Sequence, residues 1–247
     1  DCITMVLDKG LGLETAESLM NISGEYVDYL KFGWGTSIIH DEDIIKAKVE
    51  MYKNHDIIPY TGGTLFELAY MNDKLDEFFK RAHELGFPAI EISDGSINLN
   101  HDEKLESIRK AKDEGFTVLS EVGKKDPNLD KELSLDERIE YMQSELDAGS
   151  SLIIVEAREG GKNIGIFDAS GNAKEDEIDY ILDKRPDLKD AADVCLLNIR
   201  RRRLDKKKPE MKDIDAAIQY YLESLGRDNK VTKDLKKGLN ENKTEKI

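Results

Sequence analysis

Cysteine, proline and long apolar runs are scarce in this chain of 247 residues. Its two cysteines, Cys2 and Cys195, are far apart in sequence, which argues against a disulfide-stabilised scaffold and favours a reducing, cytoplasmic setting. No apolar run approaches the ~18 residues of a membrane span, and no signal-peptide pattern is present, so we expect a soluble protein. The chain begins almost on its first predicted strand, which suggests that a segment precedes it in the natural protein.

Positive charge is also in short supply. The chain carries 37 Lys and Arg against 52 Asp and Glu, a net charge of −15, which argues against general binding to nucleic acid or to an anionic membrane. Any anionic substrate then needs a local cluster of cations. In so acidic a chain, the basic run between residues 200 and 208 is better explained as a solvated face or a hinge than as a nucleic-acid site.

Six short apolar runs recur along the chain with helical patterns between them. Their starts lie about 23 to 35 residues apart, which is the size of one βα unit. Continuously apolar strands are typical of a sheet that is covered on both faces, and alternating βα units predict a parallel sheet, open or closed. The runs are residues 4–7, 27–32, 57–60, 89–92, 117–119 and 152–155.

The segments between these runs carry ordinary helix signals. Ser134 and Glu137 form a capping-box pattern at the start of one helix. Gly86, Gly115 and Gly149 stand where three helices are expected to end, a few residues before the next strand. The predicted helices span residues 41–52, 74–85, 101–114 and 134–148.

Each apolar run is followed by polar residues, most of which combine glycine with a carboxylate or an amine. The carboxyl ends of parallel strands converge on one rim, and active sites of parallel barrels are built there. The sharpest case is SEVGKK at residues 120–125, which presents a carboxylate, a glycine and two amines after a buried strand. We therefore predict one functional rim rather than six unrelated loops.

As a set and in order, these strand-end segments resemble the phosphosulfolactate synthase (ComA) family of coenzyme M biosynthesis. The resemblance extends from about residue 4 to about residue 183. It implies a (β/α)8 TIM-type barrel, a Mg²⁺ ion, and the addition of sulfite to phosphoenolpyruvate. The matching segments are VLDKG (6–10), KFGWGTS (31–37), GGTLFE (62–67), EISDG (91–95), SEVGKK (120–125) and EARE (156–159).

The last quarter of the chain departs from the family pattern. Residues 194–199 match either the eighth strand of the family or a replaced seventh strand, so the barrel is incomplete or altered at strands seven and eight. We predict a single barrel domain over residues 1–228, which is family-like over about 4–183 and divergent over 184–228. Residues 229–247 are lysine-rich and weakly apolar, and we expect a frayed tail.

Three glutamates are candidate metal ligands, because Glu91, Glu121 and Glu156 each end an apolar run on successive strands. Their carboxylates either hold the Mg²⁺ that the resemblance implies or form ion pairs with cations of the same rim. The four histidines show no metal-ligand spacing and the cysteines are not clustered, so ligation by oxygen, and hence Mg²⁺, is the consistent choice.

The resemblance also assigns a catalytic lysine. It makes Lys125 the acid that protonates the intermediate, with Lys124 as its neighbouring candidate; two solvated loop lysines are the alternative. Gly62 and Gly63 either let backbone N–H groups approach an oxyanion or form only a tight turn. Trp34 either walls the site or packs, and packing is the commoner outcome. The predicted contacts to substrate anions are Lys9, Lys31, Gly62, Gly63 and Arg158.

Three functions are compatible with these patterns. The first is a Mg²⁺-dependent carbon–sulfur lyase acting on the small anions phosphoenolpyruvate and sulfite. The second is a non-catalytic relative that keeps the fold for ligand binding or stress protection, which the altered C-terminal quarter favours. The third is another barrel enzyme that forms a lysine Schiff base with a phosphorylated small acid. The oligomeric state is left open, with a homo-oligomer as one option.

Overall fold

The structure is a computed structural model that describes residues 3–157 and 161–184. By its internal contacts the chain divides into two units, residues 1–195 and 196–247, and the described residues all belong to the first. Arg158, the strand expected at 194–199, the basic run and the tail lie outside the described residues. The single domain over residues 1–228 therefore stays a prediction. Within the described ranges, no helix has the length and apolarity to cross a bilayer.

Six parallel strands form one sheet, and their order in the sheet is their order in the chain. Each strand coincides with one of the predicted apolar runs, so the parallel α/β architecture is confirmed. The strands are β1 (Met5–Asp8), β2 (Tyr29–Phe32), β3 (Ile58–Thr61), β4 (Ala89–Ser93), β5 (Thr117–Val122) and β6 (Leu152–Val155).

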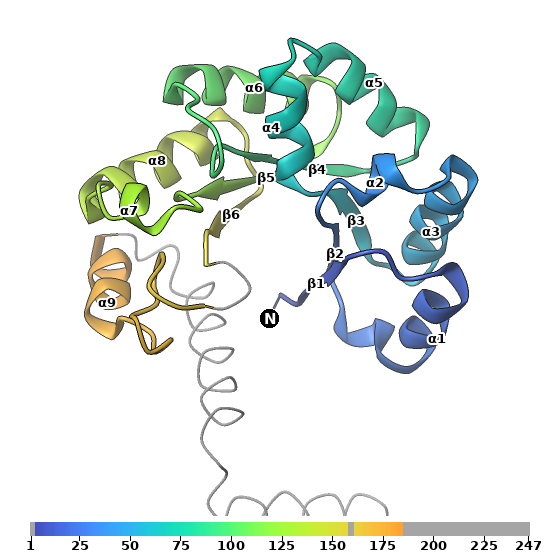
Figure 1. Ribbon diagram of the computed structural model, residues 1–247, viewed down its shortest axis with the longest axis horizontal. Helices are drawn as coiled ribbons and strands as arrows, with labels where there is room; N and C mark the ends of the chain where they lie inside the picture. The colour runs from blue at the N-terminus through green and yellow to red at the C-terminus, as the bar shows by residue number, and fades with distance from the viewer. Residues whose placement is uncertain (1–2, 158–160, 185–247) are drawn as a thin grey trace, which may run out of the picture. The chain divides into compact units, whose positions relative to one another are not determined.

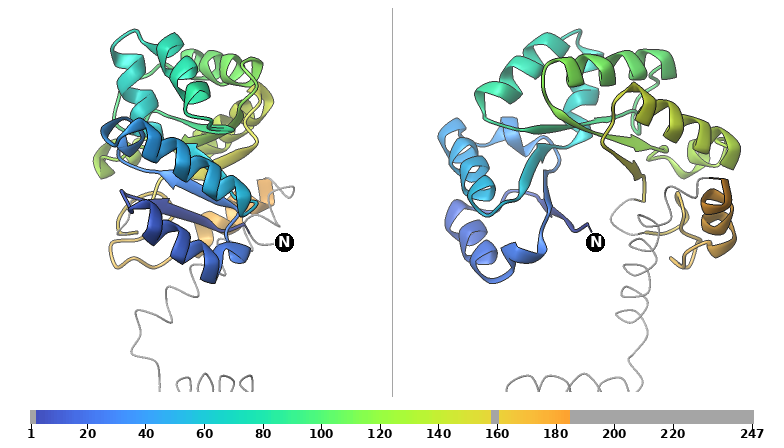
Figure 2. Two further views of the ribbon diagram at one scale, coloured as in Figure 1. Left: turned by 90° about the vertical axis from the view of Figure 1, so that its right-hand side faces the viewer. Right: turned by 180° about the vertical axis from the view of Figure 1, so that it is seen from behind.

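The sheet curls in the manner of a (β/α)8 barrel. Figure 1 shows the six strands following an arc, with the longer helices on its outer side. The view from behind in Figure 2 shows the same arc from the opposite end. Since all six strands run parallel, their carboxyl ends share one edge of this sheet.

Four helices lie where the sequence analysis predicts them. The helices α3, α5, α6 and α8 match the four predicted spans, the Ser134–Glu137 capping box is present, and Gly86, Gly115 and Gly149 all have positive φ. Other helices were not anticipated. The α-helices are α1 (Leu13–Ser23), α2 (Thr36–Ile39), α3 (Glu42–Asn54), α4 (Gly63–Met71), α5 (Leu75–Glu84), α6 (His101–Asp113), α7 (Pro127–Asp130), α8 (Leu135–Ala148) and α9 (Glu175–Lys184), and a 3-10 turn, η1, spans Gly24–Tyr26.

Strand alternation decides which side chains face the helices and which face the inside of the arc. On β4, Ile90 and Ile92 belong to the main core between sheet and helices, whereas Ala89 packs in a second cluster with Tyr60 and Leu119. Successive side chains of a strand point to opposite faces, so residues two apart share a face. Glu91 and Ser93 therefore lie on the side of Ala89, and Glu121 on the side of Leu119.

Candidate active site

Three strands bring a lysine and two glutamates together at the carboxyl edge of the sheet. Lys31 of β2 places its Nζ 2.7 Å from both carboxylate oxygens of Glu91 on β4. The same Nζ lies 4.0 Å from Oε2 of Glu121 on β5. Both glutamates are buried, and 21% of the Lys31 side chain is exposed. The predicted shared rim thus exists for these three residues.

Negative charge exceeds positive charge at this point. Burial, followed by the charge of Glu91, raises the pKa of Glu121 to about 8, although Lys31 opposes the shift. Burial would lower the pKa of Lys31, but the Glu91 and Glu121 carboxylates outweigh it and raise that pKa. Glu121 Oε1 is buried and has no hydrogen-bond partner among the described residues. Ionisation of both carboxylates at once would therefore leave the cluster short of one positive charge.

The start of α4 closes over Glu91. The N–H of Gly63 donates to Glu91 Oε1 at 2.8 Å, so a helix N-terminus faces this carboxylate. A Cβ at Gly63 would lie 2.2 Å from Ser93 Oγ, which explains the glycine. The N–H of Gly62 donates to the Phe32 carbonyl at 3.0 Å. An oxyanion contact through either N–H, as predicted, would require one of these bonds to open.

Lys125 reaches toward the same cluster from the loop after β5. Its Nζ lies 3.2 Å from Glu67 Oε2 and 3.3 Å from Thr64 Oγ1, both on α4. Its backbone N–H donates to the Gly95 carbonyl at 2.8 Å. A Cβ at Gly95 would lie 3.1 Å from Lys125 Cγ and 3.2 Å from Glu121 Oε1, so the lysine stem and the unpartnered carboxylate oxygen flank one glycine.

Lys124 is held elsewhere. Its Nζ forms an ion pair with the Asp94 carboxylate and donates to the carbonyls of Asp94 at 2.8 Å and Ile97 at 3.2 Å. These bonds tie the loop after β5 to the loop after β4. Adjacent lysines thus serve different partners.

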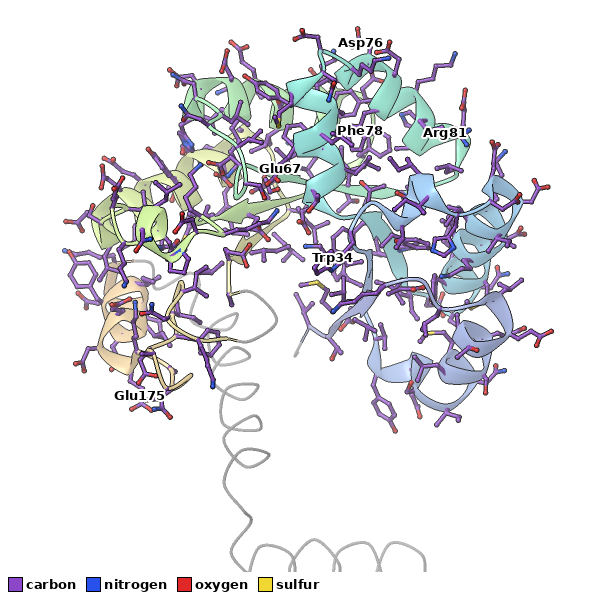
Figure 3. The ribbon with its side chains drawn as sticks, in the orientation of Figure 1. Trp34, Glu67, Asp76, Phe78, Arg81 and Glu175 are labelled. Carbon is purple, nitrogen blue, oxygen red and sulfur yellow. The ribbon has the colours of Figure 1, made fainter. Side chains whose placement is uncertain are left out.

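Lys9 and Glu156 lie at the two outer strands of the sheet. Lys9 follows β1 and places its Nζ 5.6 Å from the centre of the Trp34 ring. Trp34, labelled in Figure 3, follows β2. It is 61% exposed, so the expectation that it packs is wrong, and its φ of +59° is unusual for a bulky residue. Glu156 is buried after β6, and its charge contributes to the raised pKa of Glu121.

Two residues of this region were missed by the sequence analysis as individual candidates. Glu67 is buried on α4, and its spacing of three from Thr64 places both side chains on one helix face, a signal that was available. Lys104 of α6 is buried and donates to Asp94 at 2.8 Å and to the Glu121 carbonyl at 2.7 Å. In sequence, Lys104 looks like any lysine of a charged helix.

Glu91 and Glu121 offer the oxygen ligands that a hard divalent cation prefers. Within residues 3–157 and 161–184, no group of three or more His, Cys, Asp or Glu side chains is arranged to hold an ion by itself. Mg²⁺, however, usually takes one or two carboxylates and completes its shell with water and substrate oxygens. Glu121 Oε1 is buried beside Glu91 without a hydrogen-bond partner among the described residues, so these two side chains are the carboxylates that could contribute to such a shell.

Comparisons with known proteins agree on one family. The model of the family described as (2R)-phospho-3-sulfolactate synthase (ComA) matches residues 1–191. The phosphosulfolactate synthase of Methanothermobacter thermautotrophicus is 52% identical over 184 residues, which are 74% of this chain and 71% of that protein. That of Bacillus subtilis is 36% identical over 185 residues, 75% of this chain and 72% of that protein.

Solved structures with a similar fold include a 2,3-dimethylmalate lyase, described as a member of the PEP mutase/isocitrate lyase superfamily. It matches with a TM-score of 0.47 and 14% sequence identity. The match covers 75% of this chain and 63% of that structure.

Proposed function

This chain belongs to the (2R)-phospho-3-sulfolactate synthase (ComA) family of enzymes, and we propose that it adds sulfite to phosphoenolpyruvate in a Mg²⁺-dependent reaction. The observation that carries the proposal is the meeting of Lys31, Glu91, Glu121 and Lys125 at one rim. Each of these residues belongs to a segment that resembles the family. A cytoplasmic location and a homo-oligomeric state remain predictions.

The reaction joins two anions without a leaving group. The lone pair of the sulfite sulfur forms a C–S bond to the methylene carbon, and the C=C electrons move toward the phosphate-bearing carbon and the carboxylate. One proton then adds to that carbon, and the phosphate ester is retained. The protein must therefore stabilise charge on the substrate carboxylate and deliver one proton to one face of the intermediate.

Lys125 is our choice for the proton donor. Its side chain is 19% exposed and its ammonium contacts Glu67 and Thr64, so the lysine is held in place and still reachable from the rim. Lys31 is already engaged with Glu91 and serves best as a fixed positive charge beside the reacting carboxylate. Lys9 and Arg158 are the remaining candidates for contacts to phosphate or sulfite oxygens.

Glu121, Glu91 and Glu156 are the residues that would hold the metal. Glu121 is the strongest candidate of the three, because Glu91 already accepts from Lys31 and Gly63. When bound, Mg²⁺ supplies positive charge that stabilises the developing enolate. The glutamate carboxylates would hold the ion, and with it the positive charge, at the rim.

Nuclear magnetic resonance can follow the reaction directly. The protein is mixed with phosphoenolpyruvate, sulfite and Mg²⁺, and the vinyl protons and the ³¹P signal are recorded with time. We expect the vinyl signals to disappear while a phosphate ester persists, and only when sulfite and metal are both present. Unchanged vinyl signals in the complete mixture would refute the proposed reaction. Binding of phosphoenolpyruvate without turnover would instead favour the non-catalytic relative.

A further inference from the structure

We propose that Glu67 is a positioning residue that holds and orients Lys125 for proton delivery, an inference that rests on the proposed function for the role of Lys125. Glu67 lies on α4, and Lys125 follows β5. The Lys125 Nζ is 3.2 Å from Glu67 Oε2 and 3.3 Å from Glu67 Oε1, so the ammonium contacts both carboxylate oxygens. Figure 3 shows Glu67 on α4 beside the strand ends.

Two further hydrogen bonds hold the Glu67 carboxylate in place. Its Oε1 accepts from Ser93 Oγ at 2.7 Å and from the Ser96 N–H at 3.2 Å. Ser93 ends β4 and is the register partner of Glu121 on β5. The carboxylate therefore has a defined orientation before it meets the lysine, and a preorganised partner reduces the entropy lost when Lys125 adopts one rotamer.

Burial decides between a positioning and a catalytic role for Glu67. Only 3% of the Glu67 side chain is exposed, against 19% for Lys125, so Glu67 lies behind the ammonium and a substrate at the rim meets the lysine first. The same helix donates its Gly63 N–H to Glu91. One helix thus fixes both the proposed proton donor and a proposed metal ligand, which keeps the two at a constant separation.

Glu67→Gln tests the contact with little change in shape. The amide oxygen can still accept from Ser93 and Ser96, but the NH₂ group then faces the Lys125 ammonium, and two donors oppose each other. We expect kcat to fall by at least ~10-fold while KM for either substrate changes by less than ~2-fold, as for an interaction used in the chemical step. Glu42→Gln, which removes an exposed carboxylate paired with Arg81, is the matched control and should keep the wild-type rate.

A double-mutant cycle separates positioning from a general structural effect. In a Lys125→Ala background, Glu67→Gln should change kcat by less than ~2-fold, because its only route to the chemistry is gone. Multiplicative losses, or an unchanged kcat in the single variant, would overturn the proposal. If Glu67→Gln does not fold, Ser93→Ala takes its place, with a smaller loss of kcat that also vanishes in the Lys125→Ala background.

A chemical readout keeps the inference testable if the proposed reaction is not found. Lys125 is labelled with trace acetic anhydride in substrate-free protein, and the extent of labelling is read by mass spectrometry against the other lysines. Loss of the carboxylate partner should make Lys125 react at least ~3-fold faster in Glu67→Gln than in wild type, since its Nζ is then no longer held against α4 and meets the reagent more often. Equal labelling in both proteins would overturn the inference, whatever the enzyme catalyses.

Discussion

Lys31 and Glu91 are 60 residues apart in sequence, and Lys31 Nζ lies 2.7 Å from both oxygens of the Glu91 carboxylate. Glu121 lies near the same ammonium, with its Oε2 at 4.0 Å. One cation therefore serves two buried carboxylates. This arrangement is stable only while the lysine stays charged, and it leaves the pair of carboxylates open to a second cation.

Lys31→Met should destabilise the fold, because it leaves Glu91 and Glu121 without their shared cation. A buried partner removed in this way costs about 3–5 kcal/mol, and the partial exposure of Lys31 brings our expectation to roughly 1–3 kcal/mol. The free energy of unfolding in urea, measured without divalent cations, checks the value. Lys46→Met is the control, because Lys46 pairs with Glu42 in solvent and its loss should cost less than ~1 kcal/mol. Equal losses in the two variants would contradict this expectation.

The parallel sheet was predictable because its strands are continuously apolar and its helices end in glycines. Runs such as residues 89–92 and 152–155, spaced at the length of a βα unit, are typical of strands buried on both faces. The helix α4 was not predicted, since Thr61 to Glu67 was treated as a strand end and the two glycines suggested a turn. Gly63 is instead the first residue of the helix, and its N–H is used by Glu91, a contact that depends on tertiary structure.

Glu121 gives the protein a pH-dependent stability. Its pKa of about 8 in the folded state lies above the ordinary value of 4.5, so protonated Glu121 favours folding. That contribution is complete below about pH 4.5 and is lost as the pH rises through about 8. With a chelator present, the free energy of unfolding of wild type should therefore fall, relative to Glu121→Gln, by up to ~1.4 kcal/mol per pH unit in this window. Parallel pH profiles for the two proteins would show that Glu121 is not strained in this way.

Mg²⁺ should reverse this trend. A proton and a metal ion compete for the Glu121 carboxylate, so the stabilisation by saturating Mg²⁺ should be larger near pH 8 than near pH 5.5. Thermal unfolding with and without Mg²⁺ at the two pH values measures it, with NaCl added to match ionic strength. Glu121→Gln should lose most of the effect. A Mg²⁺ response that is the same at both pH values, or that survives in Glu121→Gln, would remove this residue from the metal site.

We expect substitution of Lys104 to cause the largest loss of stability in this region. It is buried, and its Nζ lies 2.8 Å from Asp94 and 2.7 Å from Glu145. Burial would lower the pKa of Lys104, but Glu145 and Asp94 outweigh it and raise that pKa, so the lysine stays charged. Lys104→Met leaves the buried Glu145 without its ion-pair partner, while Asp94 keeps Lys124, and we expect a loss of about 3–5 kcal/mol in urea unfolding.

Two further variants make the Lys104 prediction specific. Lys110 lies on the same helix in an exposed pair with Asp76. Lys110→Met should therefore lower the free energy of unfolding by less than ~1 kcal/mol. Adding Glu145→Leu to Lys104→Met should restore part of the stability, because one unpaired carboxylate is then removed. If the second substitution destabilises further by its full single-variant cost, the two side chains are not coupled.

Sequence could place Lys124 and Lys125 at the rim but could not assign them different partners. Residues beyond the end of a strand are not constrained by alternation, so neither direction was fixed in advance. Asp94 and two carbonyls engage Lys124, whereas Glu67 and Thr64 engage Lys125. The difference arises from two loops and a helix that are brought together only by the fold.

Substitution of Lys125 should therefore affect mainly turnover, and substitution of Lys124 mainly stability. Lys125→Ala should reduce turnover of phosphoenolpyruvate and sulfite by at least ~10²-fold, within the usual range for an acid–base group. This loss should be much larger than can be explained by the change in unfolding midpoint that follows from leaving Glu67 without its cation. Lys124→Ala should lower the unfolding midpoint, because two carbonyls lose a donor and Asp94 keeps only Lys104 of its two lysine partners. Rates per folded molecule, taken with urea midpoints on the same preparations, separate the two effects. Wild-type turnover in Lys125→Ala would remove that lysine from the chemistry, and a larger loss of rate in Lys124→Ala would transfer the acid role to its neighbour.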